Sequence, residues 1–143
     1  MAKSLKTLIR LHEWLLDEKR RALGEHMRQL DLLETGARNL ESEIVEEKVA
    51  AGANPTEGGI TYGGYARAAI KRRKHFSDAI ATKEGEIDVA RDHVIDAFQD
   101  VKTFEITQET RDRTEAEERE RVERIFLDEI GLESYRRKTR AQN

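Results

Sequence analysis

Four histidines are the side chains of this sequence best suited to chemistry, since imidazole binds metals and transfers protons near neutral pH. They are His12, His26, His75 and His93. None has a second histidine or a glutamate four residues further on, the spacing with which a helix places two ligands around one zinc ion. His12 and His26 instead lie at or next to positions of a repeating apolar stripe, which favours a packing role. We therefore expect no metal site.

The other reactive groups lack the setting that catalysis requires. The chain has no cysteine, which excludes disulfides and thiolate chemistry. The glycine-rich segment 52–64 lacks the Gly-Lys-Ser/Thr ending of a phosphate-binding loop. Carboxylates are abundant, but a catalytic pair needs a water-excluding pocket that shifts its pKa values. The sequence therefore predicts a protein that is not an enzyme and that takes no cofactor or small-molecule substrate.

Charge and hydropathy exclude further classes of protein. A net charge of −3 gives no support for nucleic-acid binding, which requires a strongly basic face. The basic run 71–74 is able to contact phosphates, but we expect an acidic segment within the same chain to be its counterpart. No apolar run approaches the roughly 18–20 residues that span a bilayer, and the N-terminus lacks a secretory cleavage site. We expect a cytoplasmic protein.

Two long helices are the elements that must position any functional residue. Charged residues make up 38% of the chain and apolar residues 37%, a balance typical of long helices and coiled coils. Glycines and the only proline gather in 52–64. We predict an all-α, single elongated domain over 1–143, with a helix over about 4–51, a turn over 52–63 and a helix over about 64–138. The apolar stripes that define the two helices contain Leu23, Leu30, Leu33, Ala37, Leu40 and Ile44 in the first, and Phe76, Ile80, Ile87, Ala90, Val94, Val101 and Phe104 in the second.

The distribution of charge predicts how the two helices pair. If the chain reverses within 52–63, residue i lies beside residue 115 − i, so the acidic segment 41–48 faces the basic segment 67–74. The same rule sets the basic segment 3–21 beside the acidic segment 94–112. Opposite charges that face each other favour an antiparallel coiled-coil hairpin.

The second helix is longer than the first and is expected to overhang. By this register the first residue reaches only to about Asp112 or Glu115, so the last 25–30 residues have no helix beside them. An exposed amphipathic helix end is a docking element for a partner. Its apolar side chains are Val122, Ile125, Phe126, Ile130, Leu132 and Tyr135.

Both ends of the chain resemble one family of proteins. The opening KSLKTLIRLHEWLLDEKRRAL, residues 3–23, and the ending LDEIGLESYRR, residues 127–137, resemble those of the flagellar export protein FliJ family. The resemblance implies an antiparallel two-helix coiled coil that acts as a stalk in flagellar type III export. Its implied partners are the export ATPase ring, the membrane-embedded export gate and the export chaperones. Its implied place is the cytoplasmic face of the inner membrane, through the export apparatus.

The resemblance also implies two contact surfaces. The ATPase side is carried over to Leu8, Arg10, Leu11, Lys19, Arg20 and Arg21. The gate side is carried over to Leu40, Ile44, Phe76, Ile80 and Lys83, several of which are also stripe residues. The family's aromatic residues late in the first helix are replaced here by Ile44 and Val45. The alternative to this reading is a generic coiled-coil scaffold or self-associating protein whose ends resemble the family only in composition.

Overall fold

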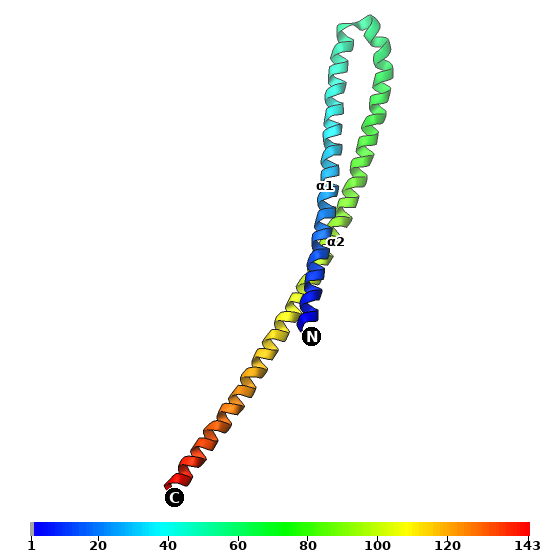
Figure 1. Ribbon diagram of the computed structural model, residues 1–143. Helices are drawn as coiled ribbons and strands as arrows, with labels where there is room; N and C mark the ends of the chain where they lie inside the picture. The colour runs from blue at the N-terminus through cyan, green and yellow to red at the C-terminus, as the bar shows by residue number, and fades with distance from the viewer. Residues whose placement is uncertain (1) are drawn as a thin grey trace. The chain divides into compact units, whose positions relative to one another are not determined.

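The computed structural model describes the backbone of residues 2–143 and the side chains of residues 5–54 and 61–143. The described backbone forms two helices, α1 over Ala2–Ala53 and α2 over Pro55–Gln142 (Figure 1). There is no strand within the described residues. The sequence favours this outcome because Ala, Glu, Lys, Leu and Arg are strong helix formers. The expected all-α fold with a longer second helix is confirmed.

Contacts divide the chain into two compact units. The hairpin unit is Glu13–Phe98, and the terminal unit is Met1–His12 together with Gln99–Asn143. In the hairpin unit, α1 and α2 run antiparallel on either side of a reversal (Figure 1). Its core is the seam between the helices, where the most buried side chains are Leu16, Leu40, Ala69, Ile87 and Ala90. Three of these five, Leu40, Ile87 and Ala90, lie on the stripes that the apolar repeat predicted.

Ion pairs between the helices fix the register of the hairpin unit. Arg73 binds Glu41 with two hydrogen bonds of 2.5 and 2.6 Å, and Arg72 binds Glu43 at 2.9 Å. These contacts join the acidic segment 41–48 to the basic segment 67–74, so the pairing that the charge distribution predicted is confirmed there. Exposed pairs of this kind contribute little energy individually, but a slipped register would lose them all.

The reversal is much tighter than the turn expected over 52–63. Only Asn54 lies outside helical geometry, and α2 begins at the next residue. Asparagine is a preferred N-cap, and proline suits the first position of a helix because its missing N–H has no partner there. Glycine also remains compatible with a helix, at a cost of about 1 kcal/mol relative to alanine. This capping pair, rather than the number of glycines, decides where α2 begins.

The terminal unit contains a short packed part and a long unpacked one. Leu5 and Val101 are its buried side chains, and the rings of His12 and Phe104 lie 4.7 Å apart. His12 and Phe104 obey the expected register, with residue i close to residue 115 − i. Every residue from 109 to 143 is exposed, so the α1 residues of this unit do not cover the end of α2. The predicted overhang is confirmed within this unit.

Two glycines of α1 provide a stability test with a matched pair of variants. A Cβ on Gly36 would lie 2.7 and 2.9 Å from two ring carbons of Phe76, whereas a Cβ on Gly24 would meet nothing within 4 Å. We expect Gly24→Ala to raise the free energy of unfolding by about 0.5–1 kcal/mol, from helix propensity alone. Gly36→Ala should raise the free energy of unfolding by less than this, or lower it, because the Phe76 ring must move. Urea unfolding followed by circular dichroism measures both, and equal gains would contradict the packing of Phe76 on Gly36.

Candidate partner-binding surfaces

The His, Asp and Glu side chains of the described residues form no metal-binding group. No group of three or more His, Asp or Glu side chains among them is arranged to hold a metal ion. His26 lies 3.4 Å from the Lys83 amine and 3.5 Å from a Glu86 oxygen, at the edge of the seam. His12 packs on Phe104. These two histidines therefore have packing partners, and the candidates described next are the two surfaces that the family resemblance implied.

The gate-side residues that the sequence singled out lie in the seam of the hairpin unit. Leu40 is only 2% exposed, and Ile44, Phe76 and Ile80 are half-buried. The structure brings Leu40, Phe76 and Ile80 together on one open groove of about 360 Å³. The rest of that groove is lined by Ala37, Arg38, Glu41, Arg73 and Ser77. It presents an apolar floor between two charged rims.

The fifth gate-side residue, Lys83, uses its amine within the hairpin unit. The amine donates hydrogen bonds of 2.6 Å to Gln29 and 2.6 Å to Glu86, and the side chain is 16% exposed. The hydrogen bond from Lys83 lowers the pKa of Glu86, and the positive charge of the amine acts in the same direction. Lys83 would have to give up these contacts in order to reach a partner.

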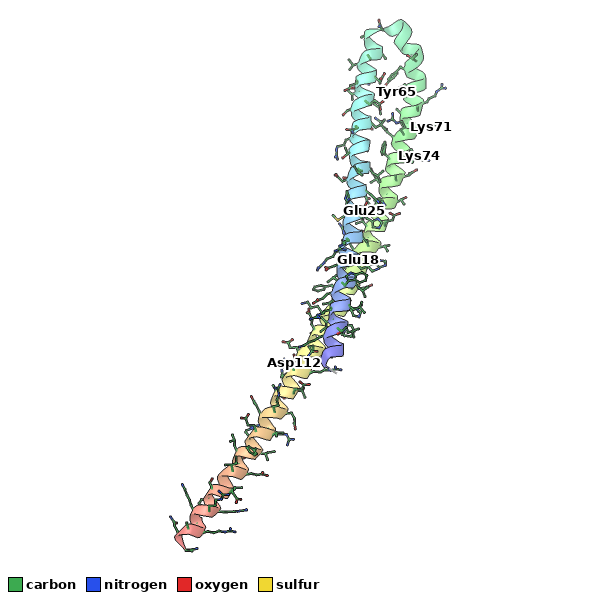
Figure 2. All side chains as sticks on the ribbon, viewed as in Figure 1. Glu18, Glu25, Tyr65, Lys71, Lys74 and Asp112 are labelled. Atoms are coloured by element: carbon green, nitrogen blue, oxygen red, sulfur yellow. The ribbon has the colours of Figure 1, made fainter. Side chains whose placement is uncertain are left out.

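The ATPase-side residues are divided between the two units. Lys19, Arg20 and Arg21 form an exposed basic cluster on α1 of the hairpin unit. Arg20 lies 3.7 Å from Asp17, and Arg21 lies 2.9 Å from Glu18, which Figure 2 labels. In the terminal unit, Leu8 is half-buried, while Arg10 and Leu11 are exposed. Both parts present groups that a second protein is able to contact.

Trp14 is a candidate that the sequence analysis did not single out. Its side chain is 57% exposed in the hairpin unit, and it stands seven residues before Arg21. Seven residues are close to two helical turns, so Trp14 and Arg21 project from the same side of α1. Tryptophan and arginine are the residues most enriched at the energetic centres of protein interfaces. The sequence feature that could have identified Trp14 is a tryptophan that lies beside the apolar stripe rather than on it.

The doubly hydrogen-bonded pair at the groove rim predicts a pH dependence. The hydrogen bond from Arg73 lowers the pKa of the Glu41 carboxyl below its usual 4.5. The ionised carboxylate is thus favoured by folding, so this contribution to stability is present above about pH 4.5 and is lost as the pH falls through the lowered pKa. Glu41→Gln should therefore show a smaller loss of stability on acidification than the parent chain.

Urea unfolding at a series of pH values from 7 down to 3 measures this difference. Glu46→Gln is the matched control, because Glu46 is an exposed carboxylate on the same helix and forms no ion pair within the described residues. Parallel acid profiles for the Glu41→Gln variant and the parent would show that the pair does not contribute.

Comparison with known proteins gives one match. The chain matches the family model for the flagellar FliJ protein over residues 1–140. No curated protein and no solved structure matches it. Across the described residues, neither helix has a stretch long and apolar enough to cross a bilayer.

Proposed function

We propose, on the premise that this chain belongs to the flagellar FliJ protein family, that it is a non-enzymatic stalk and adaptor of the flagellar type III export apparatus. Family membership gives it a role in flagellar protein export. We further propose that it engages the export ATPase ring and couples it to the export gate and the chaperones. It would work in the cytoplasm, held at the inner membrane through the apparatus. The family match over 1–140 carries this proposal.

The basic cluster supports contact with the ATPase. Lys19, Arg20 and Arg21 are exposed, and Asp17 and Glu18 neutralise only part of their charge. Positive charges gathered within one turn of a helix suit an acidic surface on a partner, which they help to recognise and orient. Trp14 adds a large apolar anchor beside Arg21. In the terminal unit, Arg10 and Leu11 offer the same combination of cation and apolar side chain.

The open groove supports contact with the gate. Its floor contains Phe76 and Ile80, and the Glu41–Arg73 pair forms part of its rim. An apolar side chain of the gate protein would fit on this floor, with polar contacts at the rim. Leu40 is too buried to touch a partner, so we assign it the role of holding the groove in shape. Ile44 and Lys83 do not line the groove, and we propose that they contact the gate outside it.

A pull-down against the export ATPase of the same organism tests the proposal. The full-length chain is immobilised, and retention of the ATPase is measured against that of a rotary-ATPase catalytic subunit of similar size. We expect selective retention. Equal retention of both proteins, or of neither, would contradict the ATPase contact.

A deletion strain tests the role in export within the cell. We expect cells without this chain to be non-motile and to secrete less flagellar protein, with both defects restored by a plasmid copy of the gene. Unchanged motility and secretion in the deletion strain would count decisively against an export role.

A further inference from the structure

The end of α2 carries a stripe of large apolar side chains that are exposed. Val122, Phe126 and Ile130 are 55%, 60% and 46% exposed. A lone helix is only marginally stable in water, and exposed apolar stripes of this kind mark surfaces that other molecules cover. A partner molecule is therefore expected to cover the apolar stripe at the end of α2.

The order of residues along the stripe indicates the partner, because that order is symmetric about Phe126. With 3.6 residues per turn, the residues between 115 and 137 that lie within about 40° of a line through Phe126 follow steps of 4, 3, 4, 4, 3 and 4, a pattern that is the same from either end. The central three are apolar, and the outer four are charged. In sequence the stripe is Glu115, Arg119, Val122, Phe126, Ile130, Glu133 and Arg137.

The charges reverse sign about the same centre. Seven residues before Phe126 stands Arg119, and seven residues after it stands Glu133. Eleven residues before it stands Glu115, and eleven after it stands Arg137. A helix laid antiparallel on its own copy would therefore place apolar on apolar at the centre and opposite charges together further out. A parallel copy would set each charge against itself, which is unfavourable.

We propose that residues 109–142 form an antiparallel pair with the same segment of a second copy of this chain, with the two-fold axis at Phe126. Such an interface is isologous, so each charge pair occurs twice. Val122 then packs on Ile130 of the other copy, Arg119 pairs with Glu133, and Glu115 pairs with Arg137. This association is independent of the proposed ATPase and gate contacts, neither of which involves 109–142.

Charges of the stripe are available for this pairing. Glu115 and Arg119 form no ion pair within the described residues, and Glu133 has only the 3.9 Å contact with Arg137 of its own helix. Three large apolar side chains per copy make a small interface, of the transient class that buries less than about 1,200 Å². The pair is thus a weak dimer that forms with rising concentration.

Sedimentation equilibrium of the full-length chain tests the pair. We expect dimer in the parent chain and in Leu132→Ser, which removes an equally exposed side chain that lies off the stripe. Phe126→Ser should shift the chain to monomer. A parent chain that stays monomeric up to the highest soluble concentration would overturn the proposal and leave the stripe to a different protein. Equal weakening by both variants would also overturn it.

A charge exchange tests the register. Arg119→Glu alone and Glu133→Arg alone should each weaken the dimer, because each sets like charges together twice. The double variant Arg119→Glu/Glu133→Arg should restore the dimer, with a dissociation constant within about threefold of the parent's. Failure of the double variant to restore the dimer, while circular dichroism shows an intact helix, would overturn the antiparallel register.

Cross-linking through introduced thiols tests direction without dependence on affinity, since the chain has no cysteine of its own. A mixture of Val122→Cys and Ile130→Cys chains should form a disulfide dimer under mild oxidation. Either variant alone should not, because equivalent positions would lie about 12 Å apart along the axis, and a disulfide needs Cα atoms within about 7 Å. Cross-linking of Val122→Cys with itself, or none in the mixture, would overturn the proposal.

Discussion

Replacement of Leu40 by alanine is expected to lower the free energy of unfolding of the hairpin unit by about 2–5 kcal/mol. Leu40 is the most buried large side chain in the described residues, at 2% exposed. Its removal deletes the floor of the seam beside Phe76 and Ile80 and leaves a cavity that two helices alone cannot close. Stabilities of small domains are about 5–15 kcal/mol, so this variant should unfold at a much lower urea concentration.

The matched control is Leu32→Ala, which makes the same chemical change on α1 where the side chain is 67% exposed. Its effect should stay within about 0.5 kcal/mol. Both midpoints come from urea titrations followed by circular dichroism. Similar losses for the two variants would show that Leu40 does not hold the helices together. Leu40 would then become a candidate for direct contact with the gate.

Reversal of the basic cluster is expected to weaken retention of the export ATPase at least about tenfold, which corresponds to 1.4 kcal/mol. The variant changes Lys19, Arg20 and Arg21 to glutamate together. The new carboxylates repel the acidic partner surface that we propose, and they also lie beside Asp17 and Glu18. Loss of binding should be most pronounced at low salt, where charge contributes most.

The control reverses an equal amount of charge elsewhere in the hairpin unit. Arg67, Lys71 and Lys74 are exposed and take part in no ion pair with a described residue, and Figure 2 shows the last two on α2. Their replacement by glutamate should leave ATPase retention unchanged. If both triple variants lose binding equally, net charge rather than the α1 cluster governs the interaction, and the proposed ATPase surface is wrong.

The sequence predicted the seam and its register because both depend on simple periodic features. Ile87 and Leu40 are buried because they recur at coiled-coil spacing, which a single sequence displays directly. The Glu41–Arg73 and Glu43–Arg72 pairs follow from blocks of opposite charge. The reversal was less predictable, because counting glycines favours a long turn. The local N-cap at Asn54 and the proline after it confine the break to one residue.

Partner-binding residues could not be separated from core residues by sequence alone. Leu40, Phe76 and Ile80 have the same residue types and spacing whether they hold the helices together or contact another protein. Burial separates them, since Leu40 is covered while the other two are half-buried at the groove. Trp14 could not be singled out from the apolar repeat for the converse reason, because it lies beside the stripe rather than on it. Exposure of a large aromatic side chain becomes visible only once the helices are paired.

The single-residue junction at Asn54 has a consequence for how the hairpin unit folds. Contacts nearest the junction join residues close in sequence: Arg72 and Glu43 are 29 residues apart, whereas Lys83 and Gln29 are 54 apart. The entropy lost in closing a loop rises with its length, by about 0.6 kcal/mol per doubling. Pairing of α1 with α2 should therefore nucleate beside Asn54 and extend away from it. During synthesis on the ribosome, α1 has no helix to pack against until the residues after Pro55 have emerged.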